Sequence, residues 1–310
     1  MFDISLIRLI PKDTKIPFIG LRLAAAVLSV LAILGSIFLF TTKNLNYGID
    51  FTGGTVWEFH LEDDPTNAQI EEIRSIGNSL GLGSIQLQTI GQADDPNGKI
   101  QALRLAIEKQ PALEGEDNDD LAQQQALDTV RKAVSAEFPS AGLVKNTLSV
   151  QVLGTKVSGE LRVKGFLAVG LALVMVLIYI WVRFEWQFGV GAVVALFHDV
   201  IITIGMFSLT QLEFNLSIVA AILTIVGYSL NDTVIVYDRI RENLRKFKKM
   251  PLADVLNLSI NDTLSRTIMT SMTTILALFA LYTLGGAGLR GFAFAMIWGI
   301  FIGTYSSIFV

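Results

Sequence analysis

The sequence predicts an α-helical polytopic membrane protein with six transmembrane helices and one small α+β domain outside the membrane. Three observations carry this prediction. Only 17% of the 310 residues are charged, whereas a soluble domain carries about 25%. The mean hydropathy is +0.54, and the apolar residues are gathered in blocks rather than spread along the chain. One long polar insertion, residues 43–162, separates the first block from the others.

Each apolar block is long enough to cross a hydrocarbon core of roughly 30 Å as a helix of about 20 residues. The first block exceeds the usual apolar core of a signal peptide and no small-x-small cleavage site follows it, so we expect it to be retained. Only Gln211–Glu213 separates the third block from the fourth, which predicts a tight helical hairpin. The six blocks are residues 22–41, 164–182, 188–210, 214–237, 267–284 and 291–310.

Lysine and arginine in the short loops predict the orientation, because cytoplasmic loops carry an excess of these residues. They fill the N-terminal segment and the loop after the fourth block, which share one side of the membrane if all six blocks span it. The short loops on the other side hold only Arg290. The predicted order is a cytoplasmic segment at 1–21, a first span at 22–42, an extracytoplasmic domain at 43–162, and the other five spans within 163–310, with a basic cytoplasmic loop at 239–265.

The insertion has the pattern of a ferredoxin-like βαββαβ domain. Alternating apolar and polar residues predict strands, and apolar residues at helical spacing predict helices. The predicted strands are GGTVWEFHLE, SIQLQTIG, IQALRLAIE and LVKNTLSVQVLG, and the turn ADDPNGK joins the second to the third. The predicted helices contain Ile70, Ile73, Ile76 and Leu80 in one case and Leu121, Leu127, Val130 and Val134 in the other.

The sequence carries no pattern of an enzyme, a metal site or a cofactor site. It has no cysteine, which excludes disulfides and thiolate metal ligands. It has no HExxH, GxSxG or Walker motif. The acidic stretch EGEDNDD at 114–120 lacks the spacing of an EF-hand, so we interpret it as a solvated loop. The basic run RIRENLRKFKK predicts a topology signal and a contact with anionic membrane lipids, not a nucleic-acid site.

Polar residues inside the predicted spans are the candidate functional residues. A carboxylate at the centre of a membrane helix costs about 2.5–3.5 kcal/mol, so Asp232, which follows Asn231 in the fourth span, needs a reason to be there. Arg266 stands at the start of the fifth span, at a depth that we expect to match Asp232. The third span contains His198 and Asp199 midway along its length.

Two polar faces are predicted to meet between the fourth and fifth helices. Arg266, Thr270 and Thr274 repeat at a spacing of four residues, as do Tyr228 and Asp232. One interpretation is a structural ion pair that holds the helices together, or an Arg266 that extends to the interface alone. The other is a proton site, because burial favours the neutral carboxyl group while a nearby arginine favours the charged one.

For the third span, a histidine hydrogen-bonded inside the bundle is the favoured interpretation, ahead of a proton relay. Asp199 is then either the partner of His198 or a residue that faces the fourth helix. Neither alternative is decided by the sequence.

Several motifs together resemble the SecD/SecF family of protein translocase subunits, and within it the SecF branch. They are GIDFTGGT, LFHDVIIT, GYSLNDTVIVYDRIREN, LSRTIMTSMTT and GTYSSIF, in the family's order and over nearly the whole chain. The resemblance implies a fold related to the resistance–nodulation–division transporters and a place in the bacterial inner membrane. It implies a SecD partner, the SecYEG channel, YajC and YidC as neighbours, and the proton-motive force as the drive for exporting unfolded preproteins.

The resemblance also assigns residues. The family's aspartate of the fourth helix and arginine of the fifth are tied to proton use, and they match Asp232 and Arg266. SecD is expected as a separate chain that supplies a further intramembrane aspartate, and we expect a polar tail beyond Val310. In IDFTGG, Gly53 and Gly54 are expected to allow a tight turn from the first helix into the first strand, while Asp50 caps or anchors it.

Two other functions remain open at this point. One is a proton-coupled exporter half of the resistance–nodulation–division superfamily, although such exporters carry two six-helix halves and larger outer domains. The other is a translocon scaffold in which Asp232 and Arg266 only lock two helices together.

Overall fold

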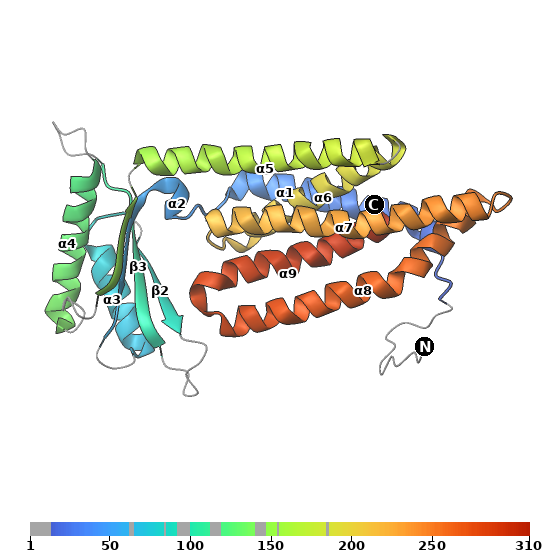
Figure 1. Cartoon of the computed structure of the whole chain (residues 1–310). Coiled ribbons are helices and arrows are strands. Elements are labelled where there is room, and N and C mark those ends of the chain that lie inside the picture. The colour runs from blue at the N-terminus through green and yellow to red at the C-terminus, as the bar shows by residue number, and fades with distance from the viewer. Residues whose placement is uncertain are drawn as a thin grey trace.

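The computed structural model describes residues 14–61, 65–83, 85–91, 100–111, 119–139, 147–153, 155–183 and 186–310. The described chain forms an elongated helical bundle with an α+β domain at one end (Figure 1). We call this end of the bundle the domain end and the opposite one the far end. The predicted turn ADDPNGK and most of the acidic stretch at 114–120 lie outside the described residues.

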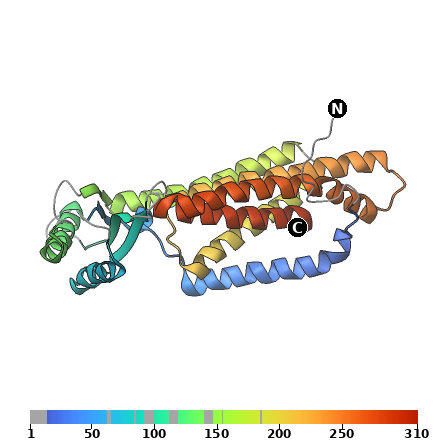
Figure 2. The ribbon, with the colours of Figure 1, turned by 90° about the horizontal axis from the view of Figure 1, so that it is seen from below.

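Six helices in the described part of the chain are long and apolar enough to cross a membrane, which confirms the predicted number and order. The first follows a short 3₁₀ turn, η1 (Phe18–Leu21), and stands apart from most of the bundle in Figure 2. The six are α1 (Arg22–Lys43), α5 (Thr155–Arg183), α6 (Trp186–Thr210), α7 (Leu216–Lys246), α8 (Leu252–Leu284) and α9 (Gly286–Phe309).

The predicted basic loop at 239–265 is wrong. Helix α7 continues to Lys246 and α8 begins at Leu252, so residues 247–251 alone connect them at the far end (Figure 1). The hydropathy pattern marks only the apolar part of each helix, whereas polar contacts hold the rest together. Arg239 lies 2.8 Å from Asp262, and the Asn243 amide donates to the Ser259 hydroxyl at 3.1 Å. Both contacts join α7 to α8.

The α+β domain confirms the predicted ferredoxin-like βαββαβ order. Its antiparallel sheet has the strand order β2-β3-β1-β4, with β1 and β3 in the centre. Both helices pack on one face of the sheet, where Trp57, Ile73, Leu105 and Val130 have no exposed surface. The elements are β1 (Gly54–Phe59), α3 (Asn67–Ser79), β2 (Ile85–Gly91), β3 (Ile100–Glu108), α4 (Asp119–Glu137) and β4 (Thr147–Leu153).

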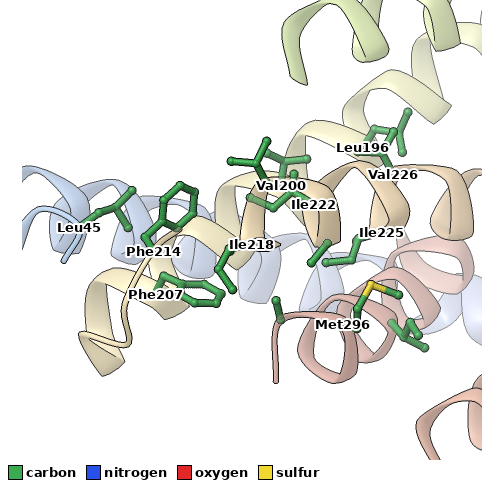
Figure 3. Close-up of a cluster of buried hydrophobic side chains, with 14 of the residues drawn as sticks. Leu45, Leu196, Val200, Phe207, Phe214, Ile218, Ile222, Ile225, Val226 and Met296 are labelled. Atoms are coloured by element: carbon green, nitrogen blue, oxygen red, sulfur yellow. The ribbon is translucent and has the colours of Figure 1, made fainter. Parts of the chain in front are cut away.

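Helix α7 is the centre of the bundle and packs against α5, α6, α8 and α9. Its residues Ile218, Ile222 and Ile225 meet α6 and α9 in the core shown in Figure 3. Lipid tails are as apolar as these side chains, so helices in a membrane gain by close packing at small residues. Gly299 of α9 shows this, because a Cβ there would collide with the Ile225 side chain. Asp232 therefore belongs to a helix that packs against four others.

Candidate functional site

The α7 helix places Asp232 midway along its length with its side chain turned into the protein. Only 2% of Asp232 is exposed, and its Oδ2 atom has no hydrogen-bond partner. Buried polar groups are almost always hydrogen-bonded, and a buried carboxylate without partners is strongly unfavourable. This conformation therefore accommodates Asp232 with a neutral carboxyl group. A charged Asp232 would need a partner that this conformation does not bring to it.

Arg266 is exposed and forms no ion pair with Asp232 within 4 Å. The contacts between α7 and α8 explain why Asp232 and Arg266 do not meet. Tyr228 meets Thr274 and Asn243 meets Ser259, and in this register Asp232 is level with Thr270. Arg266 then lies about one helical turn, roughly 6 Å, closer to the far end. The expectation that Asp232 and Arg266 lie at matched depth is wrong by this turn.

The predicted polar seam between α7 and α8 contains one direct contact. The hydroxyl groups of Tyr228 and Thr274 are 3.4 Å apart, at the long limit of a hydrogen bond. Thr270 instead donates to the carbonyl groups of Arg266 and Thr267 in its own helix, and Asn231 is exposed. The Thr267 hydroxyl is buried and has no partner. The seam around Asp232 therefore holds two buried polar groups whose hydrogen bonding is incomplete, and sequence reasoning missed Thr267.

The second buried carboxyl group, Asp199, is fully bonded. Its Oδ1 lies 2.9 Å from Nδ1 of His198, and its Oδ2 accepts hydrogen bonds from Ser229 of α7 at 2.6 Å and Ser306 of α9 at 2.8 Å. Both alternatives left open by the sequence are therefore realised, since Asp199 is the partner of His198 and also faces α7. Ser229 and Ser306 were not predicted, although Ser229 stands three residues before Asp232 and so shares its helix face.

The same network extends to α1 through Tyr305. The Tyr305 ring stacks on His198 with centroids 5.9 Å apart, and its hydroxyl donates to the Ala25 carbonyl at 3.0 Å. That hydroxyl is also hydrogen-bonded to Ser29 at 3.0 Å. Hydrogen bonds and one ring contact thus connect α1, α6, α7 and α9.

The IDFTGG motif lies at the domain end. Gly53 and Gly54 have φ angles of 75° and 136°, which favour glycine, and a Cβ on Gly54 would collide with the Ile107 carbonyl. The turn lies at the predicted glycines, but a four-residue helix, α2 (Ile49–Thr52), precedes it in place of α1. The Asp50 carboxylate accepts a hydrogen bond from the Leu216 N–H of α7 at 2.9 Å.

No cluster of three or more His, Asp or Glu residues that could hold a metal ion occurs in the described ranges. The six long apolar helices, which enclose acidic groups, and the small α+β domain define a multi-pass membrane protein.

Comparison with known proteins identifies the family. The family "Protein export membrane protein SecD/SecF, C-terminal" matches residues 133–310, and the "SecD/SecF GG Motif" family matches residues 38–63. The chain belongs to the SecD/SecF family of protein export membrane proteins. This membership makes it a transport protein and not an enzyme, as the sequence predicted.

The similar proteins extend over nearly the whole chain. The protein translocase subunit SecF of Rhodobacter capsulatus is 42% identical over 98% of this chain and 89% of its own length. The SecF of Cereibacter sphaeroides is 43% identical over 98% and 90%. The crystal structure of SecDF, a translocon-associated membrane protein from Thermus thermophilus, matches 97% of this chain at 35% identity with a TM-score of 0.77. This chain spans only 38% of that SecDF chain.

Proposed function

We propose that this chain is the SecF subunit of a complex with SecD that uses the proton-motive force to promote protein export across the bacterial inner membrane. The similarity to SecF subunits over nearly the full length supports the subunit assignment. The 38% coverage of a SecDF chain supports a SecD partner, which would supply the remaining part of such an assembly. The SecYEG channel, YajC, YidC and an unfolded preprotein are the further partners that the family resemblance implies.

The proposed orientation follows the positive charge. Six basic residues in the last turns of α7 and the connection to α8 lie at the far end of the bundle, opposite the α+β domain (Figure 1). Cytoplasmic segments carry such an excess, so the far end faces the cytoplasm and the α+β domain lies outside. The basic residues are Arg239, Arg241, Arg245, Lys246, Lys248 and Lys249.

The observation that carries the proton-coupling proposal is the incomplete bonding of Asp232. A buried carboxyl group without a partner gains little from staying charged, so it takes up a proton readily when one is supplied from outside. Loss of that proton leaves a charge that attracts Arg266 from one turn away. Proton uptake and release therefore change the attraction between α7 and α8, next to the long contact of Tyr228 with Thr274.

The energy available is sufficient for such a change. One proton moving inward yields about 2.3 kcal/mol per 100 mV of membrane potential and about 1.4 kcal/mol per pH unit. Shifting a two-state element from 1:99 to 99:1 needs about 5.5 kcal/mol. At 100 mV and one pH unit one proton supplies about 3.7 kcal/mol, so a few protons per cycle supply enough energy for such a switch.

The test is export of a preprotein in membrane vesicles after SecA and ATP have begun the process. Wild type and Asp232→Asn are compared with and without a proton gradient, after co-purification has verified assembly with SecD. Asp238→Asn is the matched control, because it makes the same substitution six residues further along α7 at an exposed position. We expect a gradient to accelerate export in wild type and the control but not in Asp232→Asn.

Equal acceleration in all three would contradict the proposal and leave a translocon scaffold as the better account. Failure of the wild type to respond to the gradient would contradict it as well.

A further inference from the structure

The segment that leads from α1 to the α+β domain is bound to the loop between α6 and α7. We call residues 44–53 the linker. The backbone N–H of Gly48 donates to the Phe214 carbonyl at 2.9 Å, and the Phe214 N–H donates to the Asn46 carbonyl at 2.7 Å. The Asn46 amide donates to the Gln211 carbonyl at 3.0 Å. Two segments about 165 residues apart are therefore paired like short strands.

Aromatic packing fixes the same contact from within. Phe214 is 2% exposed, and its ring lies 6.2 Å from that of Tyr47, 5.9 Å from that of Phe51 and 5.8 Å from that of Phe207, measured between centroids. These residues belong to or pack against the same core as Ile218 and Ile222 of α7, and Figure 3 shows Phe207 and Phe214 at one end of it. The linker is thus part of the bundle.

Asp50 adds a contact to α7 itself. The first turn of a helix leaves backbone N–H groups without partners, and a negative charge there is favourable. Asn215 satisfies two of them, accepting from Ser217 at 3.1 Å and Ile218 at 3.3 Å. Asp50 satisfies the N–H of Leu216. The start of α7 is therefore capped by its own N-cap residue, Asn215, and also by Asp50 of the linker.

The linker passes directly from this cap into the centre of the α+β sheet. Helix α2 holds Asp50 in a bonded turn, with the N–H groups of Phe51 and Thr52 donating to the Gly48 carbonyl. After Gly53 the chain enters β1, which pairs with β3 on one side and β4 on the other. Three residues separate Asp50 from the first of these pairs at Gly54.

Helix α7 continues without a break from Leu216 to Asp232, a distance of about 24 Å. We propose that Asp50 is a positioning residue that ties the α+β domain to α7, so that a change at Asp232 is transmitted through α7 and the linker to the domain. This inference rests on the proposed role of Asp232 in the preceding subsection. It adds the residue through which the membrane site acts on the outer domain.

Hydrogen exchange by mass spectrometry tests the proposal without an export assay. The complex with SecD is studied in nanodiscs, and the probe is Asp232→Asn, which fixes an uncharged side chain at that position. We expect it to change the exchange of the peptides that cover the linker and β1 at least twofold. In an Asp50→Ala background the same substitution is expected to leave these peptides unchanged.

Asn215→Ala is the matched control, because it removes cap hydrogen bonds from the same helix end but leaves the linker contact in place. Both Asp50→Ala and Asn215→Ala are expected to speed exchange in the first turn of α7 by about fivefold, the usual effect of a lost cap. Only Asp50→Ala is expected to abolish the response of the linker and β1 to Asp232→Asn.

Leu216→Pro breaks the same hydrogen bond from the other partner and guards against misfolding of Asp50→Ala. Proline lacks the N–H but is well accepted at the first position of a helix, and Asn215 before it already has the extended backbone that proline requires. It is expected to abolish the response as Asp50→Ala does, whereas Asp50→Asn, which keeps an acceptor oxygen, is expected to retain it.

The proposal is overturned if Asp232→Asn leaves the linker and β1 unchanged in the wild-type background. It is also overturned if the response survives both Asp50→Ala and Leu216→Pro, or if Asn215→Ala removes it equally. A proton-driven export assay that fails while these exchange results hold would count against the proposed function alone.

Discussion

Two carboxyl groups lie in the same membrane bundle with almost the same exposure and opposite surroundings. Asp199 is 1% exposed and bonded to His198, Ser229 and Ser306, whereas Asp232 is 2% exposed and has an oxygen without a partner. Both must overcome the same unfavourable transfer from water into the membrane. Asp199 recovers that energy through contacts within the chain, and Asp232 does not.

The difference separates structure from function. A group whose hydrogen bonds are complete in one conformation stabilises that conformation and resists change. A group whose bonding is incomplete gains when its protonation state or its partner changes, so it responds to its surroundings. We therefore assign Asp199 to holding α6, α7 and α9 together, and we keep Asp232 for the proposed response to protons.

The largest expected effect comes from Asp199→Ala. Three polar groups on three helices would lose their acceptor, and each such hydrogen bond contributes about 0.6–1.7 kcal/mol inside a membrane. The free energy of unfolding should fall by about 2–5 kcal/mol, which thermal unfolding of the purified complex in detergent would measure.

Ser306→Ala is the graded control for this change, because it removes one of the three contacts and should cost about a third as much. An Asp199→Ala protein as stable as wild type would mean that the network does not hold the helices together. The structural role assigned to Asp199 would then be contradicted.

A smaller effect is expected for Asp232→Asn in the same unfolding measurement. The substitution preserves shape and replaces a group that is incompletely bonded, so stability should stay within about 1 kcal/mol of wild type or rise. This variant should therefore keep the stability of the wild type and lose proton-driven export. A loss of 2 kcal/mol or more, on the scale of about 1–3 kcal/mol for a lost buried partner, would show that Asp232 has a structural contact like that of Asp199.

The fold was largely predictable because its determinants are local. Span number follows from apolar blocks, and the βαββαβ order follows from the change between alternating and helical patterns. The extent of α7 and α8 beyond the membrane was not predictable from hydropathy. It depends on contacts such as Arg239 with Asp262, which join residues that the pattern alone assigned to a loop.

Asp232 could be named as a candidate from the sequence, whereas Thr267, Ser229, Ser306 and the geometry of the site could not. A charged residue in an apolar span identifies Asp232 without any structure. Its distance from Arg266 depends on the register of two helices, and a shift of one turn decides between an ion pair and a gap. The serine partners of Asp199 lie 30 and 107 positions away, and serine is too common in membrane helices for its pattern to reveal them.

The smallest expected effect belongs to Tyr228→Phe, which removes the contact with Thr274 and leaves the ring in place. At 3.4 Å this hydrogen bond is long, so the loss of stability should not exceed about 0.6 kcal/mol. A double-mutant cycle with Thr274→Val measures the contact itself, and we expect a coupling energy well below that of a Ser229–Asp199 cycle run in parallel. Beside Asp232 the polar contact between α7 and α8 is this long hydrogen bond, whereas the Arg239–Asp262 and Asn243–Ser259 contacts lie nearer the far end, so the seam beside Asp232 is where α8 can move. If the Tyr228–Thr274 coupling is as strong as that of Ser229 with Asp199, then α8 is held firmly to α7 beside Asp232. The proposed movement of α8 at this seam would then be contradicted.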